Sequence, residues 1–290
     1  MTPLMCASPA GTPTARPGAA GSYPELVERV VSGEFGPLPD DLRITSAFTT
    51  HQAVRHDGRN TGYRNEVLSL RLAGAVGSCA VEPGTLPGHV VAECAGSDAC
   101  SLLGHPLLPV RVAALDAYLM HTHRHGPVSG ALTCALPGGS SLLRSRARAR
   151  AVVSLLRLPP GRRVLVVGVV NSLLEALRTR GLDYVPCDFK GGITEWGEPV
   201  VTDAIEALDH CDAVLASGMT LGNGTFEDLR VHAQEEGKPL VMFAQTGSAV
   251  LPRLIGSGVT AVCAEPYPFF WLDGGPSSVH LYDGHTGATP

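Results

Sequence analysis

The spacing of hydrophobic residues differs between the two halves of the chain. In the first half, apolar residues at positions 26, 27, 30 and 31 recur at helical spacing, and Gly33 ends this predicted helix. Strand-like segments follow over 43–50 and 66–72, joined by a polar loop, and a second helix is predicted over 109–120. The first half is therefore predicted to be α+β.

From residue 163, short β-branched runs alternate with helical segments and glycine-rich turns. Continuous apolar strands separated by helices are typical of a parallel sheet covered on both faces. This pattern predicts a Rossmann-like domain. The expected strands cover 163–167, 183–187, 212–216, 239–244 and 259–263, and the expected helices cover 172–179, 202–208, 225–236 and 249–255.

The domain boundary is predicted near 137–150, where glycine, serine and an arginine run indicate an exposed linker or a surface helix. We therefore expect an α+β domain over 23–140 and the Rossmann-like domain over 141–290. Residues 1–22 are rich in Ala, Pro, Gly and Thr and lack the apolar segment of a signal peptide. They are predicted to form a disordered tail.

Composition narrows the class of protein. Hydrophobic residues make up 44% of the 290 residues and charged residues 17%, which is typical of a globular chain. The net charge of -5 and the absence of a broad basic face argue against a nucleic-acid partner. No apolar stretch approaches the roughly 18 residues of a membrane span. Eight scattered cysteines without a Cys-x-x-Cys pair are expected to be reduced thiols of a cytoplasmic protein.

The segment 216–228 carries the strongest ligand-binding signal. It follows an apolar strand and opens a helix with Thr225 as the expected N-cap, while Thr220 and Asn223 offer neighbouring side chains. Backbone N–H groups at a helix start attract anions. The alternative is a structural turn in which glycines such as Gly224 serve only backbone geometry.

Another polar loop, with Thr246 and Ser248, follows the next predicted strand. In an open parallel sheet the carboxyl ends of neighbouring strands share one edge, and ligands bind in the crevice outside that edge. Two polar loops at this edge strengthen the prediction of a ligand site.

The first turn after a parallel strand contains Gly168 and Asn171 but only one of the three glycines of the dinucleotide fingerprint. A nicotinamide or flavin cofactor is therefore disfavoured. Asp188 stands twenty positions after Gly168, where a carboxylate can bind ribose hydroxyls. A nucleoside cofactor such as S-adenosylmethionine remains open, against the alternative that Asp188 caps the next turn.

The polar loop of the first half combines several reactive side chains. His56 or Glu66 could act as acid or base, Arg59 and Arg64 could bind a carboxylate or phosphate, and Tyr63 could donate a proton. We expect Arg59 or Arg64 to point into a cleft between the domains. A solvated hairpin loop without a ligand is the alternative.

One run could bind a divalent metal, because His121, His123 and His125 end a predicted helix and imidazole is a good zinc, nickel or copper ligand. Histidines at a helix C-terminus also interact with the last carbonyl groups or with solvent. We favour this second interpretation and expect any metal to enter with the substrate.

Several of these segments resemble one known family. The stretches Gly218-Met-Thr220-Leu-Gly-Asn223-Gly224-Thr225, Thr246-Gly-Ser248-Ala-Val-Leu-Pro252 and Pro109-Val-Arg-Val-Ala-Ala-Leu-Asp-Ala-Tyr118 are similar to segments of the "putative heavy-metal chelatase" family. The resemblance implies an enolase-N-like domain followed by a Rossmann-like domain, with the active site in the cleft between them. The chain departs from the family at Gly222, where a hydrophobic residue is usual, and at 246–248, where Gly-Pro-Ser is usual.

Taken together, these features predict a cytoplasmic enzyme, a transferase or lyase, that acts on a small anionic or metal-chelating metabolite in an interdomain cleft. One alternative is a non-catalytic protein that binds a metal or a metallophore. Another is a nucleoside-cofactor transferase of specialised metabolism. A homodimer is left open.

Overall fold

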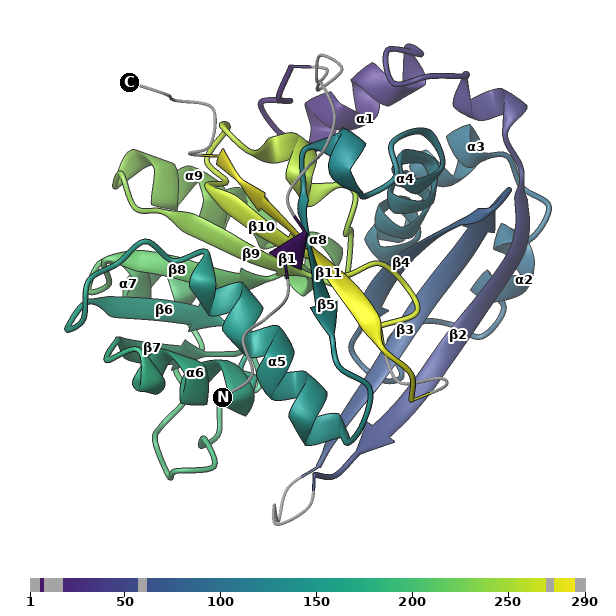
Figure 1. Ribbon diagram of the computed structural model, residues 1–290. Helices are drawn as coiled ribbons and strands as arrows, with labels where there is room; N and C mark the ends of the chain where they lie inside the picture. The colour runs from purple at the N-terminus through teal and green to yellow at the C-terminus, as the bar shows by residue number, and fades with distance from the viewer. Residues whose placement is uncertain (1–5, 8–17, 57–61, 270–273, 285–290) are drawn as a thin grey trace.

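The computed structural model describes residues 6–7, 18–56, 62–269 and 274–284. Most of the predicted tail and Arg59 lie outside these described residues. The strands form two sheets, a small antiparallel one and a large, mostly parallel one, which Figure 1 shows side by side with α4 between them. The fold is mixed α/β, as predicted.

The small sheet has the order β2-β3-β4, with β2 (Ile44–Val54), β3 (Tyr63–Leu72) and β4 (Ala75–Val81) antiparallel. Helix α4 (Leu108–Thr122) packs closely on β4. Gly77 of β4 permits this approach, because a Cβ at that position would lie only 1.9 Å from the backbone nitrogen of Ala117. The surrounding short elements are α1 (Tyr23–Val31), η1 (Pro39–Asp41), α2 (Val90–Cys94), α3 (Ala99–Leu103) and η2 (Pro127–Ser129).

The large sheet has the order β1-β5-β11-β10-β9-β8-β6-β7. Its parallel strands are β6 (Arg163–Val167), β7 (Asp183–Cys187), β8 (Ala213–Ser217), β9 (Leu240–Ala244) and β10 (Ala261–Ala264), and its antiparallel strands are β11 (Ser277–Asp283), β5 (Leu132–Leu136) and β1 (Cys6–Ala7). The predicted parallel strands are confirmed. The antiparallel strands were not predicted, and β5 precedes the expected domain boundary.

Across the sheet, the parallel strands follow the order β7-β6-β8-β9-β10, so the first parallel strand in the chain, β6, lies between the second, β7, and the third, β8. Successive strands are added in one direction from β6 to β7 and in the other direction from β8 onward. The carboxyl ends of β6 and β8 therefore flank a topological switch point, where doubly wound sheets form a crevice for ligands.

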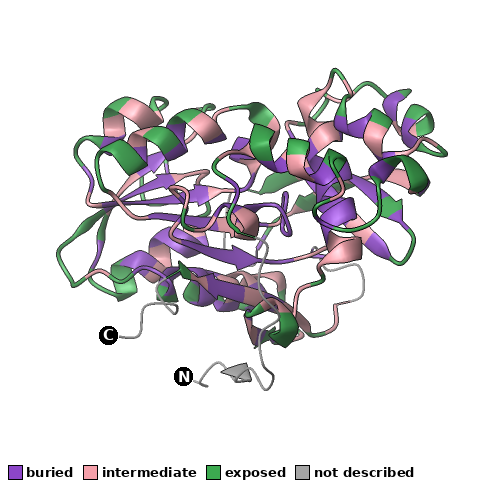
Figure 2. Ribbon diagram, turned by 90° about the horizontal axis from the view of Figure 1, so that it is seen from above, coloured by how far each residue is buried: buried purple, intermediate pink, exposed green. Residues whose placement is uncertain are grey.

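Helices cover both faces of this parallel region and bury apolar residues against it (Figure 2). One face carries α5 (Ser141–Ser154) and α6 (Asn171–Thr179), and the other carries α7 (Ala204–Leu208), α8 (Met219–Asn223), α9 (Phe226–Glu235) and η3 (Leu251–Leu254). The arginine run forms the surface helix α5, which is one of the two alternatives expected for it, and its small residues Ala147 and Ala151 are buried. The helix expected over 249–255 is wrong, because only a 3-10 turn forms there.

Candidate functional site

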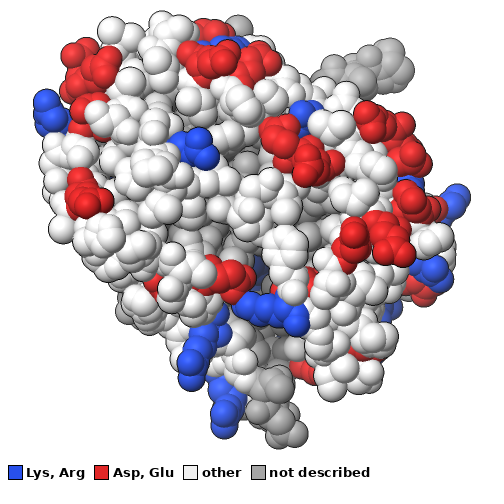
Figure 3. Space-filling view, turned by 180° about the vertical axis from the view of Figure 1, so that it is seen from behind, with Lys and Arg blue, Asp and Glu red and all other residues white. Residues whose placement is uncertain are grey.

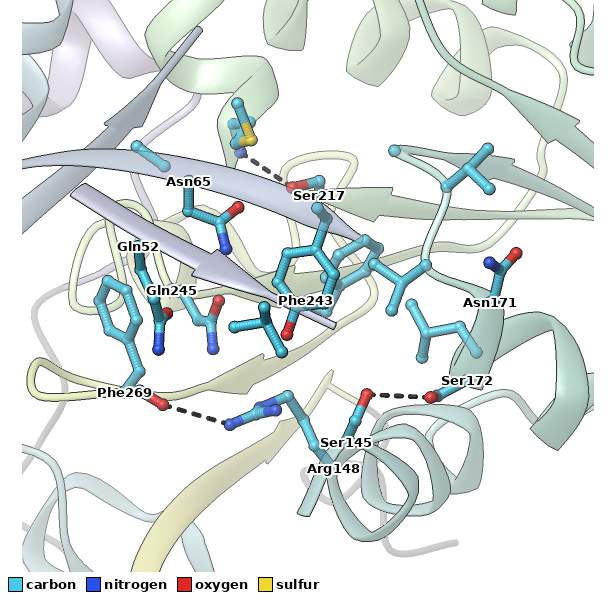
Figure 4. A pocket seen from close by; sticks show the side chains of 18 of the residues that line it. Gln52, Asn65, Ser145, Arg148, Asn171, Ser172, Ser217, Phe243, Gln245 and Phe269 are labelled. Carbon is cyan, nitrogen blue, oxygen red and sulfur yellow. Dashed lines mark hydrogen bonds between the residues drawn. The ribbon is translucent and has the colours of Figure 1, made fainter. Parts of the chain in front are cut away.

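The main cavity has a volume of about 530 Å³ and lies between the small sheet and the carboxyl ends of β6, β8 and β9. The small sheet contributes Gln52 and Asn65, the large sheet contributes Ser217 and Phe243, and α5 closes another wall (Figure 4). The cavity thus occupies the crevice at the switch point. Acidic and basic side chains are interspersed on the face of the molecule that Figure 3 shows.

Four residues predicted as catalytic line this cavity: His56, Tyr63, Arg64 and Glu66. The Nδ1 atom of His56 lies 2.7 Å from the Ser141 hydroxyl, and its ring meets the Tyr63 ring edge-on at 5.7 Å. A carboxylate oxygen of Glu66 accepts a hydrogen bond of 2.8 Å from the backbone of Gly84. Both His56 and Glu66 are buried, whereas Tyr63 and Arg64 are exposed.

A buried ion pair in the cavity wall was missed from the sequence. The Arg148 guanidinium donates to both carboxylate oxygens of Glu265, and the Gln245 amide donates to the same carboxylate at 2.7 Å. Glu265 is buried and Arg148 is partly buried on α5. Arg144 and Arg148 stand four residues apart on a face with buried alanines, and this spacing was the available signal.

The turn after β6 contributes Gly168 and Asn171 to the cavity. Gly168 has a φ of +90°, and a Cβ there would lie 2.8 Å from the Ser217 Cβ. The fold thus requires glycine at this position. The side-chain oxygens of Asn171 and Gln52 are buried and have no hydrogen-bond partner among the described residues.

Asp188 follows β7 and lies where the main cavity meets a second cavity of about 250 Å³. Its carboxylate accepts backbone hydrogen bonds from Val169 at 3.4 Å and from Lys190 at 3.1 Å. The Lys190 ammonium lies 2.5 Å from the Glu82 carboxylate across the cavity mouth. Both interpretations of Asp188, ligand contact and turn cap, are compatible with this position.

The segment after β8 differs from the predicted glycine-rich loop. The short helix α8 begins immediately at Met219, Gly224 ends it with a φ of +85°, and α9 then begins. Thr225 occupies the N-cap position of α9, but its hydroxyl donates to the Asn223 side chain at 2.7 Å and makes no cap bond. Asn223, Thr225 and the buried Thr220 line the second cavity.

Thr246 and Ser248 line neither of these cavities, contrary to their predicted role. The Thr246 hydroxyl accepts a hydrogen bond of 2.8 Å from the backbone of Ala80, which joins the two sheets. The Ser248 hydroxyl lies 3.4 Å from the Asp116 carboxylate and 3.3 Å from Nε2 of His125. Both side chains are buried in structural contacts.

The contacts of Ser248 belong to an interlayer cluster formed by Asp116, His125, Ser248 and Tyr282. The Asp116 carboxylate also accepts backbone hydrogen bonds from Ser78 at 2.9 Å and from Ala249 at 2.7 Å. Burial raises the pKa of Asp116 to about 7 despite these bonds. Burial, with smaller contributions from neighbouring cationic groups, lowers the pKa of His125 to about 3.

The histidine run takes separate partners. Helix α4 ends at Thr122, and His123 contacts the Thr122 hydroxyl at 2.9 Å while its ring meets Phe35 edge-on. His125 stacks on His280 at 4.9 Å and contacts the Tyr282 hydroxyl at 2.7 Å. Across the described ranges, no three His, Cys, Asp or Glu residues are grouped so that they could hold a metal.

Two further expectations concern cysteines and membranes. Among the cysteines that the structure describes, six are free, but Cys134 is disulfide-bonded, so the expectation that all cysteines are reduced is wrong at this position. Within the part of the chain that the structure describes, no helix has the length and apolarity needed to cross a bilayer.

Comparison with known proteins gives a match to one family model over part of the chain and no activity. Residues 151–264 match the model of DUF364, described as "Putative heavy-metal chelation". A DUF364 protein of unknown function from Desulfitobacterium hafniense DCB-2 is 16% identical, with 83% of this chain and 85% of that chain covered and a TM-score of 0.55. Another, from Pyrococcus horikoshii, is 14% identical, with coverages of 89% and 99% and a TM-score of 0.55.

No curated protein matches the chain. The two solved structures show the shared fold, and the family model covers much of the parallel sheet. The resemblance predicted from the sequence is therefore confirmed: over residues 151–264, the chain matches the "putative heavy-metal chelation" family, DUF364.

Proposed function

We propose that the chain is an enzyme that binds a small anionic or metal-chelating metabolite in the main cavity. The cavity of about 530 Å³ at the switch point carries this proposal, because both sheets contribute polar side chains to one space. Ligand sites of metabolites have this size.

Unsatisfied groups in the wall define what the ligand must offer. The side-chain oxygens of Gln52 and Asn171 are buried without a partner among the described residues, and a buried acceptor without a donor is costly. Both oxygens have almost no accessible surface, so a ligand with N–H or O–H groups would satisfy them only after the two side chains turn toward the cavity. Arg64 at the exposed end of β3 would bind a carboxylate or phosphate of the same ligand. Chelating metabolites combine both kinds of group.

Acid–base chemistry would come from His56 and Glu66. The Ser141 hydroxyl fixes the His56 ring, and an oriented imidazole is suited to proton transfer near neutral pH. Glu66 holds its carboxylate on the same wall, 3.7 Å from the His51 ring. In this proposal His56 and Glu66 exchange protons with the ligand, and Tyr63 supports them at the cavity edge.

The residues do not fit a resident metal. The cavity carboxylates are held by Gly84, Arg148 or Lys190, and His125 is occupied by the interlayer cluster. Under the proposal a metal therefore arrives as part of the metabolite. The enolase-N-like and Rossmann-like descriptions and a cytoplasmic location stay predictions.

The proposal is tested by affinity selection from a bacterial metabolite extract, with mass spectrometry of the retained compounds. The wild-type chain is expected to retain an anionic or chelating compound, and Asn65→Trp, which fills the cavity, is expected to lose it. Arg64→Ala should weaken retention by about tenfold or more, since a charge-assisted hydrogen bond contributes about 1.5–3 kcal/mol. Arg71→Ala, an exposed arginine on the same strand outside the cavity, is the matched control.

Equal retention by the wild-type chain and Asn65→Trp would contradict the proposal. Repeating the selection with extract depleted of divalent metals distinguishes the two ligand classes. An anion is retained in both extracts, whereas a metal complex is retained only with metal present.

A further inference from the structure

The second cavity lies beside the main one and differs from it in chemistry. It has a volume of about 250 Å³ and is bounded by the turn after β7, the start of α7 and the helices α8 and α9. Gly168, Asp188, Ser217 and Met219 line both cavities, so a single ligand can extend from one into the other.

The wall of this cavity is mainly apolar and includes an exposed aromatic ring. Phe189, Ile205 and Leu229 line it, and 63% of the Phe189 side chain is exposed. A planar, weakly polar group could cover the Phe189 ring, because aromatic rings stack and bury large apolar areas. A purine base has this shape and chemistry.

Asp188 stands where a nucleoside would present its ribose. It immediately follows β7, the strand next to β6, and comes twenty positions after Gly168. In doubly wound sheets, a carboxylate at this place binds ribose hydroxyls. Each oxygen of Asp188 accepts one backbone hydrogen bond, at 3.4 and 3.1 Å, and a carboxylate can accept about four.

Charge argues against a phosphate on this nucleoside. The charged side chains among the described residues that line the second cavity are all acidic: Glu82, Asp188, Asp203 and Asp228. Such a lining repels a phosphate and tolerates a neutral or cationic group. The turn after β6 needs glycine at position 168 because a Cβ there would clash with Ser217. Binding of a pyrophosphate is therefore not needed to explain this glycine.

We infer that the second cavity binds a purine nucleoside that carries no 5′ phosphate. The base lies among Phe189, Ile205 and Leu229, and the ribose hydroxyls donate to Asp188. The 5′ position lies where the two cavities meet, beside Glu82 and Asp188, which line both. A neutral or cationic 5′ substituent extends from there past Gly168 into the main cavity, and in this respect the inference rests on the proposed function. Such a ligand would be a cosubstrate or the metabolite itself.

The test is isothermal titration of the full chain with adenosine, adenosine 5′-monophosphate and 2′-deoxyadenosine. Adenosine is expected to bind, and the monophosphate and the deoxynucleoside are each expected to bind at least tenfold more weakly. Asp188→Asn should lower the affinity for adenosine at least tenfold and leave the thermal unfolding temperature nearly unchanged, because asparagine still accepts the Lys190 hydrogen bond. Phe189→Ala, an exposed position, should weaken adenosine several-fold.

Asp183→Asn is the matched control, since Asp183 is exposed at the opposite end of the same strand. Three results would overturn the inference: no heat of binding with millimolar adenosine, tighter binding of the monophosphate, or unchanged affinity in Asp188→Asn. Retention of a metabolite by the wild-type chain but not by Asn65→Trp would meanwhile leave the proposed function intact. Failure of the two ideas can therefore be told apart.

Discussion

The main cavity and the interlayer cluster lie between the same two sheets and use the same residue types, yet they differ in how their polar groups are satisfied. In the cluster, Asp116 accepts three hydrogen bonds, and the Ser248 hydroxyl contacts both Asp116 and His125. In the cavity, the oxygens of Gln52 and Asn171 are buried without a partner among the described residues.

This difference indicates which of the two regions is suited to bind a ligand. Serine, histidine and aspartate meet in the cluster, as they do in many hydrolases, but Ser248 is only 1% exposed and no substrate could reach it. Fully paired buried groups stabilise and specify a packing arrangement. Groups with unused hydrogen-bonding capacity at an accessible cavity are those that a ligand can complete.

The largest expected effect is on stability and comes from Asp116→Ala. The substitution leaves the backbone N–H groups of Ser78 and Ala249 buried without an acceptor, and each such group costs about 1–3 kcal/mol. We expect the free energy of unfolding, measured by urea denaturation, to fall by about 2–5 kcal/mol. Asp183→Ala, an exposed control, should change it by less than about 0.5 kcal/mol. A similar small effect for Asp116→Ala would show that the cluster does not hold the sheets together.

A smaller effect concerns pH. Because burial raises the pKa of Asp116 from 3.8 to about 7, the folded chain keeps a proton that the unfolded chain has released between about pH 4 and 7. The contribution of Asp116 to stability therefore falls as pH rises through this range. His125 acts oppositely, since its pKa is lowered from 6.5 to about 3 and its contribution rises with pH.

In the wild-type chain these two contributions oppose each other, and Asp116→Asn removes one of them. The stability of Asp116→Asn relative to the wild type is expected to rise with pH between about 4 and 7, by at most about 1.4 kcal/mol per pH unit. Urea denaturation of both proteins at several pH values measures this slope. A difference in stability that is the same at every pH does not affect it. A difference that is flat or falls with pH would refute the assignment of the buried proton to Asp116.

The smallest effect on stability is expected in the cavity. Gln52→Met removes a buried oxygen that has no partner among the described residues and keeps the side chain's size, so stability should stay the same or rise by up to about 1 kcal/mol. Metabolite retention should nevertheless be lost. Thr246→Val, which deprives the Ala80 backbone of its acceptor, should instead lower stability by about 1–2 kcal/mol and keep retention. The opposite pattern would mean that Gln52 is structural.

Much of the fold was predictable from local pattern. The parallel strands β6 to β10 are continuous apolar runs between helical segments, and period and length identified them within a residue or two. The antiparallel strands β5 and β11 were not predicted. They are far apart in sequence, and only the pairing of β11 with β5 and with β10 makes them part of the sheet.

The candidate site was predictable only in part. The sequence singled out His56, Tyr63, Arg64 and Glu66 as one polar segment and placed Gly168, Asn171 and Asp188 at the edge of the sheet, and these residues do line the main cavity. Arg148 and Glu265 were missed because their contact joins α5 to a segment 117 residues later in the chain. Gln245 was missed because it contacts the Glu265 carboxylate, which follows a different strand. The spacing of Arg144 and Arg148 on a face with alanines was the one local signal, and it does not reveal that Glu265 is the partner of Arg148.

The sequence by itself determined the residue types, the periodicities and therefore the parallel sheet with its turns at the carboxyl edge. Only the tertiary structure decided which polar side chains stay available. Thr246 and Ser248 follow a strand end just as Asp188 does, but they face the small sheet and are satisfied by Ala80, Asp116 and His125. A side chain's hydrogen-bonding capacity is local, whereas its remaining capacity after folding depends on partners from distant segments.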